Sequence, residues 1–280
     1  MGLSSEPQGS DGLGARSSQA DLTVGKSVFD LTGRTVLVTG ASSGVGAHLA
    51  HVLAMHGARV VLAARRETLL TALRDNIAAA GGRAMAVGMD VADEASVQAG
   101  FDVAEATFGR VDVVIANAGV NAPGSALGLE VDDFDRIVAV NLRGVFLTAR
   151  EGARRMIKLQ SDAAPEGRVV IISSVTAHHA PPGVAAYSAT KAAVVQLGRV
   201  LAREWAGKGV NVNMLCPGYM LTDLTEGHWD DARGRALLEQ FPRRRLMDLQ
   251  ALDPLALYLS SDASTQVTGS VFDVDDGQTL

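Results

Sequence analysis

Short apolar runs alternate with longer amphipathic stretches along the chain from residue 34 onward. The apolar runs are rich in β-branched residues, while the stretches between them are rich in Ala and Leu and open near Gly, Asp or Ser. This alternation is typical of βαβ units on a parallel sheet. Seven runs are predicted to be strands, at 35–39, 60–63, 84–89, 111–116, 168–173, 210–215 and 271–274.

The stretches between these runs are long enough for crossover helices, which we expect at 45–56, 68–80, 95–108, 132–157 and 187–208. Because the runs are almost continuously apolar, the strands should be covered on both faces. The predicted fold class is α/β, with one Rossmann-like, doubly wound parallel sheet of about seven strands and helices on both faces. The segment 219–249 breaks the rhythm and follows a late strand, so we expect it to cover the ligand crevice.

The N-terminal segment 1–27 is rich in Gly, Ser, Gln and Asp and has no apolar stretch of the kind found in secretory signals. We expect it to be a flexible extension, followed by a single catalytic domain at 28–280.

Composition narrows the classes of partner. A net charge of -6 over 280 residues is mild, so we do not expect nucleic acid or an anionic membrane surface as a partner. The expected partner is a small molecule. The single cysteine, Cys216, cannot form an internal disulfide, which fits a cytoplasmic protein, and we expect it to be a buried core residue. His178 and His179 are adjacent but lack a metal-ligand pattern, so no metal site is predicted.

A glycine-rich turn follows the first predicted strand and leads directly into a helix. Glycines lack a Cβ atom, so they permit a tight turn and let a pyrophosphate approach backbone N–H groups at the positive end of the helix. A merely structural turn is the alternative, but the position on the first strand of a βαβ series argues against it. The turn residues assigned to cofactor binding are Gly40, Ser42, Ser43, Gly44, Val45 and Gly46.

Tyr187 and Lys191 are four residues apart and would share one side of a helix. A nearby ammonium favours tyrosinate, which predicts a phenol pKa lowered from its reference of about 10 toward the working range of a general acid or base. An ordinary pair of side chains on a helix surface is the alternative.

The Thr-Gly-x3-Gly-x-Gly turn and the Tyr-x3-Lys pair resemble the short-chain dehydrogenase/reductase family, in particular its 3-oxoacyl-carrier-protein reductases. The resemblance extends from about residue 29 to residue 279. It implies that Ser174 polarises the substrate carbonyl, that Tyr187 supplies the proton and that Lys191 also binds the nicotinamide ribose. Ser173 would face the opposite side of an extended chain. Asn141 matches the family's asparagine that bonds a helix carbonyl and a water in a proton relay.

The same resemblance implies further cofactor contacts after the third, fourth and sixth strands, from Asp90, Val91, Asn117, Ala118, Gly119, Pro217, Gly218 and Thr222. It also implies a homodimer or homotetramer. One departure lies near the end of the chain, where the family more often carries glycine at the position of Asp276.

Cofactor choice depends on the end of the second strand. Enzymes that prefer NAD carry an acidic residue there to bind the ribose hydroxyls, whereas this chain has Ala64. Arg65 and Arg66 follow, and a guanidinium is well shaped to bind a phosphate. We therefore predict NADP as the preferred cofactor, with Arg65 in its binding site and NAD as the alternative.

The predicted activity is NADP(H)-dependent interconversion of a ketone or 3-oxo carbonyl and a secondary alcohol, with Tyr187 as general acid and base. The alternatives are an NAD-dependent alcohol dehydrogenase working oxidatively and a cofactor-sensing protein of the same fold without chemistry. A fairly apolar substrate pocket is expected from Ala185, Ala186, Tyr219, Met220, Leu221 and Trp229.

Overall fold

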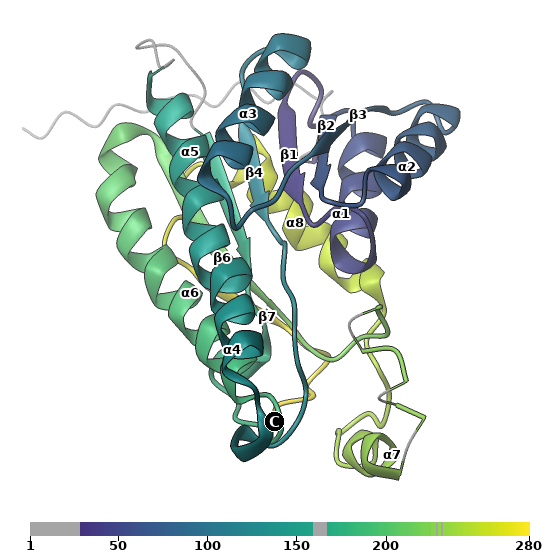
Figure 1. Cartoon of the computed structure of the whole chain (residues 1–280). Helices are drawn as coiled ribbons and strands as arrows, with labels where there is room; N and C mark the ends of the chain where they lie inside the picture. The colour runs from purple at the N-terminus through teal and green to yellow at the C-terminus, as the bar shows by residue number, and fades with distance from the viewer. Residues whose placement is uncertain (1–28, 159–166, 224, 228, 231) are drawn as a thin grey trace, which may run out of the picture.

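The computed structural model describes residues 29–158 and 167–280, apart from 224, 228 and 231. Its centre is a sheet of seven parallel strands in the order β3-β2-β1-β4-β5-β6-β7 (Figure 1). The predicted α/β fold class is confirmed, while the expected extension at 1–27 lies outside the described residues. The strands are β1 Thr35–Thr39, β2 Arg59–Ala64, β3 Arg83–Gly88, β4 Val113–Ala116, β5 Gly167–Ile172, β6 Val210–Pro217 and β7 Val271–Val274.

Helices cover both faces of this sheet (Figure 1). One apolar core packs α1, α2 and α8 against one face, and a second packs α3, α5 and α6 against the other. Because both faces are covered, the side chains of β1, β4, β5 and β6 are buried from end to end. The helices are α1 Gly44–Met55, α2 Glu67–Ala79, α3 Glu94–Phe108, α4 Val131–Val138, α5 Val145–Lys158, α6 Ala185–Trp205, α7 Ala232–Leu238 and α8 Asp253–Ser260.

The single helix predicted over 132–157 is interrupted. The π-helical segment Ala139–Gly144 separates α4 from α5 and contains Asn141. A π-helical turn holds about one more residue than an α-helical turn and occurs frequently at functional sites. Hydrophobic periodicity could not reveal it, because the apolar pattern on either side remains helical.

Two short helices were not predicted. Helix α8 spans eight residues and has Pro254 in its first turn, while α7 spans seven. Both are too short to show a repeated apolar face, so their stability depends on packing against the rest of the fold.

The segment 219–249, expected to cover the crevice, contains α7, and a bridge between Met220 and Met247 joins its two ends. Ala236 and Leu237 of α7 line the cleft at the carboxyl ends of the strands. Part of the segment thus lies at the cleft, and its covering of a bound ligand stays a prediction.

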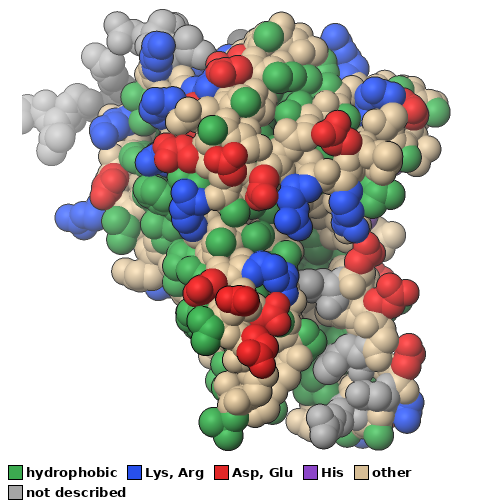
Figure 2. Space-filling view, viewed as in Figure 1, with side chains coloured by type: hydrophobic (Ala, Val, Ile, Leu, Met, Phe, Trp, Pro, Cys, Tyr) green, Lys and Arg blue, Asp and Glu red, His purple; other side chains and the backbone are tan. Residues whose placement is uncertain are grey.

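The surface over α3 and α5 carries acidic and basic side chains side by side, whereas acidic side chains gather over α4 (Figure 2). Within the described residues, every helix is too short or too polar to cross a membrane.

Candidate active site

One large cleft of about 1600 Å³ opens at the carboxyl ends of the strands. It exceeds the roughly 300–1,000 Å³ of a typical small-molecule pocket, so a dinucleotide and a substrate can fit together. The strand order reverses at β1, which pairs with β2 on one side and β4 on the other. Ligands of open α/β sheets bind outside such a reversal.

The turn after β1 depends on its glycines. A Cβ atom at Gly46 would lie 2.4 Å from the carbonyl oxygen of Gly40, and a Cβ atom at Gly40 would lie 2.8 Å from the Cα of Ala118. Gly44 begins α1 with a φ of 54°. Among the described residues, no side chain caps this helix and no acidic residue lies in its first turn. Its first N–H groups are therefore available to phosphate oxygens, which fits a bound dinucleotide.

Two arginines lie at the end of β2, beside this turn. Arg66 donates hydrogen bonds to the Ser42 hydroxyl, at 3.1 Å from Nε and 2.8 Å from Nη2, and to the Ser43 hydroxyl at 2.7 Å. Arg65 is exposed and also lines the cleft, next to Ala64. The site predicted from sequence included Arg65 and omitted Arg66. Because the two arginines are adjacent in the sequence, both were candidates for this position. Which of them reaches the glycine turn depends on the direction of its side chain, which the sequence does not show.

Asp90 and Val91 line the cleft after β3, as predicted. One carboxylate oxygen of Asp90 accepts a hydrogen bond from the backbone N–H of Ala92 at 2.9 Å, which holds the loop. Val91 contacts the π-helical segment so closely that a Cβ atom at Gly144 would lie 2.7 Å from its Cγ2. The predicted contact of Asp90 with the adenine stays a prediction.

The strand end after β4 is tied to β1. The Asn117 amide donates to the carbonyl of Thr39 at 2.9 Å, and the Thr39 hydroxyl accepts the backbone N–H groups of Asn117 and Ala118 at 3.0 and 3.1 Å. These bonds fix the backbone path through Ala118 and Gly119, both of which line the cleft.

Asn141 is fully buried and holds the loop after β4. Its side-chain oxygen accepts the N–H of Val120 at 2.8 Å, and its amide donates to the Val120 carbonyl at 2.9 Å and to the Thr190 hydroxyl at 3.3 Å. The Val120 carbonyl belongs to the loop after β4. The expectation that the Asn141 side chain bonds a helix carbonyl is therefore wrong. The π-helical turn explains the difference, because it determines the direction in which the Asn141 side chain leaves the helix.

The two serines after β5 point in different directions, as predicted. Ser174 lines the cleft, and its hydroxyl accepts the N–H of Thr176 at 3.2 Å. Ser173 turns its hydroxyl to the backbone carbonyl of Lys191 at 2.9 Å, so it anchors α6.

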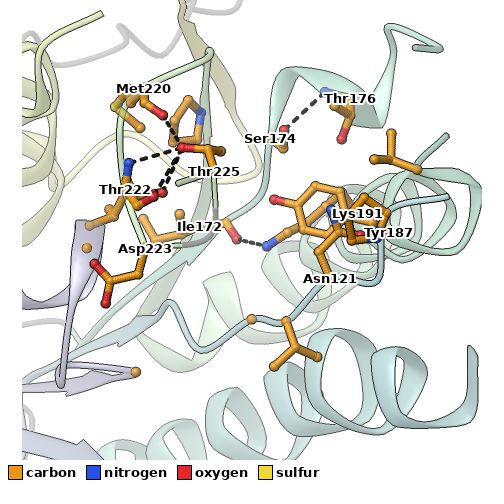
Figure 3. Close-up of a pocket in the computed structure, with 18 of the residues that line it drawn as sticks. Asn121, Ile172, Ser174, Thr176, Tyr187, Lys191, Met220, Thr222, Asp223 and Thr225 are labelled. Atoms are coloured by element: carbon orange, nitrogen blue, oxygen red, sulfur yellow. Dashed lines mark hydrogen bonds between the residues drawn. The ribbon is translucent and has the colours of Figure 1, made fainter. Parts of the chain in front are cut away.

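Tyr187 and Lys191 lie on one side of α6 and line the cleft beside Ser174 (Figure 3). The Lys191 ammonium donates to the Ile172 carbonyl at 2.9 Å and lies 5.4 Å from the centre of the Tyr187 ring. Desolvation lowers the pKa of Lys191 to about 8. Desolvation also raises the pKa of Tyr187 to about 12, against a smaller lowering from the Ser174 hydroxyl. The expected lowering of the phenol pKa is therefore wrong for this structure, because burial outweighs the lowering effect of the Ser174 hydroxyl.

The loop after β6 closes the cleft on the cofactor side. Thr222 lies against the glycine turn, since a Cβ atom added at Gly44 would be 3.6 Å from the Cβ atom of Thr222. The Thr225 hydroxyl accepts the N–H of Thr222 at 3.0 Å and donates to the Met220 carbonyl at 2.7 Å, which stabilises the loop (Figure 3). Pro217 and Gly218 also line the cleft, as predicted.

An aromatic group forms the outer part of the cleft. The Tyr219 ring stacks on Phe241 at 5.2 Å between centroids and meets Trp229 edge-on at 5.8 Å. The apolar pocket expected from sequence is only partly present. Tyr219, Met220 and Trp229 line the cleft, but Leu221 is 63% exposed and lies outside it. Ala185 and Ala186 are also outside the lining, which includes the polar residues Asn121, Ser125, Thr176, Asp223, Glu226 and Gln240.

The departure at Asp276 has a backbone consequence. Its φ is 53°, a conformation that glycine adopts more readily. Its carboxylate pairs with Arg245 at 2.7 Å and with Arg243 at 3.2 Å.

Comparison with known proteins places these features in context. The sequence pattern of the short chain dehydrogenase family matches residues 34–233. The oxidoreductase UcpA of Salmonella typhimurium is 39% identical over 258 residues, which cover 89% of this chain and 96% of that protein. The 3-oxoacyl-[acyl-carrier-protein] reductase FabG of Escherichia coli is 34% identical over 89% of this chain and 98% of its own. The structure of a gluconate 5-dehydrogenase from Burkholderia cenocepacia in complex with NADP and tartrate has a TM-score of 0.84 and 36% identity, covering 90% of this chain and 97% of that one.

Proposed function

This chain belongs to the short-chain dehydrogenase family of NAD(P)-dependent oxidoreductases, and from that membership we propose that it reduces a ketone or 3-oxo carbonyl with NADPH, using Tyr187 as the proton donor. The observation that carries the proposal is that Ser174, Tyr187 and Lys191 line the same cleft as the glycine turn. A nicotinamide cofactor supplies the hydride when it is bound. The residues of this chain bind the reactants and move the proton.

Each catalytic side chain has a separate task in this proposal. The Ser174 hydroxyl donates a hydrogen bond to the substrate oxygen and polarises the carbonyl. The Tyr187 hydroxyl gives its proton to the same oxygen as negative charge develops there. With its pKa raised to about 12, the phenol is fully protonated at neutral pH, which suits reduction better than oxidation. The Lys191 ammonium, fixed by the Ile172 carbonyl, orients the cofactor ribose next to Tyr187.

NADP is the proposed cofactor because positive charge lies where a 2'-phosphate would bind. Ala64 contributes no carboxylate at the end of β2, while Arg65 and Arg66 both line the cleft there. Arg66 already bridges the hydroxyls of Ser42 and Ser43, so its guanidinium is oriented before a phosphate arrives. The NADP named for the Burkholderia cenocepacia relative agrees with this assignment.

A kinetic comparison tests the proposal. Loss of absorbance of the reduced nicotinamide is followed with NADPH or NADH and a panel of ketones and 3-oxoacyl thioesters. We expect Tyr187→Phe to lower kcat by about 10²–10⁴-fold while still binding cofactor. We expect Arg66→Ala to raise the KM for NADPH by about tenfold or more, through loss of a charge-assisted bond, and to raise the KM for NADH much less.

The matched control for the arginine is Arg74→Ala, since Arg74 pairs with Asp75 on α2 and lies outside the cleft lining. Equal kcat/KM values of the wild type for NADPH and NADH would contradict the assignment of NADP as the preferred cofactor. Full activity of Tyr187→Phe would remove the mechanism. Cofactor binding without turnover in either direction would favour the cofactor-sensing alternative.

A second candidate is the NAD-dependent oxidation of a polyhydroxy acid. The polar lining of the cleft, which includes Asn121, Thr176 and Asp223, favours it (Figure 3). The likeness to a gluconate 5-dehydrogenase supports the substrate class of this candidate but not its cofactor, since that structure contains NADP. Oxidation of gluconate with NAD that is faster than ketone reduction with NADPH would support this candidate over the first.

A further inference from the structure

Three side chains of metal-ligand type meet at the carboxyl edge of the sheet, outside the residues that line the cleft. They are His178, Cys216 and Asp273, and their ligand atoms all lie within 4.8 Å of one another. They form the one such group of three among the residues that the structure describes.

The fold brings these residues together from three separate segments. Cys216 and Asp273 are register partners in the neighbouring parallel strands β6 and β7, so their side chains leave the same face of the sheet. His178 follows the short 3₁₀ turn Val175–Ala177 after β5, and its Nε2 lies 3.2 Å from a carboxylate oxygen of Asp273.

The donor atoms are an imidazole nitrogen, a sulfur and a carboxylate oxygen, each of which is a normal ligand of Zn²⁺. We propose that His178, Cys216 and Asp273 bind one Zn²⁺ ion, with water as the fourth ligand. Tetrahedral bonds of about 2.0–2.3 Å place ligand atoms roughly 3–4 Å apart, and the His178–Asp273 pair at 3.2 Å already has this spacing, so any adjustment moves that pair relative to the Cys216 sulfur. His178 and Asp273 can make this adjustment, because each is nearly half exposed while Cys216 is fixed in the buried strand.

Binding has a defined proton balance. The pKa of the Cys216 thiol is raised to about 11 by burial and by the charge of Asp273, so the thiol is protonated at neutral pH. When the sulfur–zinc bond forms, the S–H bond breaks and one proton passes to the solvent; no electron is transferred.

The proposed site lies close to the catalytic residues. His178 is four residues beyond Ser174, and the Cys216 thiol contacts the Ser173 hydroxyl and the Ser174 backbone. An ion that draws His178 and Cys216 together therefore acts on the segment that presents the Ser174 hydroxyl to the substrate. We expect bound Zn²⁺ to slow turnover.

Cobalt provides the test of binding, because Co²⁺ occupies zinc sites and a thiolate ligand gives it a sulfur-to-metal charge-transfer band in the near ultraviolet. The purified full chain should show this band with one Co²⁺ bound, and Zn²⁺ should displace it. The band should disappear in Cys216→Ser. His178→Ala and Asp273→Asn should each weaken Zn²⁺ binding by about tenfold or more, as measured by competition with a chromophoric chelator.

His179→Ala is the matched control, since this histidine is adjacent, exposed and outside the group of three. An unchanged Zn²⁺ affinity in His179→Ala is expected. Absence of the band in the wild type, or equal weakening by His178→Ala and His179→Ala, would overturn the proposed site. If Cys216→Ser does not fold, the exposed His178 and Asp273 variants decide the question.

The expected inhibition of turnover by Zn²⁺ rests on the proposed function. The cobalt spectrum tests metal binding alone and does not depend on that function. Zn²⁺ should slow ketone reduction by the wild type and by His179→Ala, but not by His178→Ala at the same concentration. Equal slowing of all three would mean that inhibition does not pass through this site.

Discussion

At the scale of single residues, burial shifts the pKa values of Tyr187 and Lys191 in opposite directions. The pKa of Tyr187 is raised to about 12 and that of Lys191 is lowered to about 8, because desolvation disfavours the charged form of each group. Lys191 is 3% exposed, and its ammonium donates a hydrogen bond to the Ile172 carbonyl. Burial of the charged lysine therefore lowers the free energy of unfolding of the protein.

The lysine makes a prediction about stability and pH. Its pKa is about 8 in the folded protein and 10.5 as an isolated group. Between these values the unfolded chain binds more protons than the folded one, so this group makes stability rise with pH. Below pH 8, where both states are protonated, burial of the ammonium costs about 3 kcal/mol, and this cost is relieved as the pH approaches 10.5.

Lys191→Met, which lacks the charge, should therefore gain stability relative to the wild type most strongly below pH 8. Its relative gain should shrink by up to about 3 kcal/mol toward pH 10.5. Urea unfolding of both proteins without cofactor, across this pH range, measures the difference. A difference that does not change with pH would show that Lys191 is not desolvated as described.

The site residues differ in how far sequence could predict them. The glycine turn and Tyr187 were predictable because their chemistry depends on spacing within one element. Arg66 was omitted in favour of Arg65 because the choice depends on side-chain direction. The cluster of His178, Cys216 and Asp273 could not be predicted, because it depends on the register between strands that are far apart in the sequence.

At the scale of elements, strands were easier to predict than helices. The seven strands were each found as an apolar run, and four of them, β1, β4, β5 and β6, are buried from end to end because helices cover both faces of the sheet. Helices α7 and α8 were missed because an apolar face repeats too few times in seven or eight residues. The π-helical segment was missed because it spans only six residues and the apolar pattern on either side of it remains helical.

The junction of β1 and α1 is the element most sensitive to added volume. A Cβ atom at Gly46 would lie 2.4 Å from both the Gly40 carbonyl oxygen and the Asn117 amide nitrogen. Gly46→Ala must therefore displace backbone, and we expect a loss of about 1–3 kcal/mol in stability together with much weaker cofactor binding. Thermal unfolding and fluorescence titration with NADPH measure the two effects.

Gly207→Ala is the control for this substitution, because a Cβ atom there meets nothing within 4 Å. It should leave both measurements close to the wild-type values. Equal cofactor affinity of Gly46→Ala and wild type would contradict the close packing described for the turn.

At the scale of the whole molecule, the C-terminal segment holds the cleft together. Gln278 is 6% exposed, and its side chain accepts the Tyr219 N–H at 2.6 Å and donates to the carbonyls of Tyr219 and Arg245 at 3.1 Å. It therefore links the loop after β6 to the segment after α7, although these segments are separated from it by many residues.

Gln278→Ala should loosen both segments at once. We expect the KM values for cofactor and substrate to rise by about tenfold and stability to fall by about 1–3 kcal/mol, since buried backbone groups lose their partners. Steady-state kinetics and urea unfolding provide the measurements. Gln250→Ala, at an exposed glutamine, is the control. Unchanged KM values in Gln278→Ala would mean that the loops keep their positions without this link.

The π-helical segment Ala139–Gly144 makes the helix sensitive to the deletion of a single residue. Each residue of an α-helix turns the chain by about 100°, so removing one residue here would rotate everything before it by that angle relative to α5. Asn141 would then no longer face Val120, even if every side chain in the cleft were kept. A deletion of one residue between Asn141 and α5 should thus break the hydrogen bonds by which Asn141 holds the loop after β4.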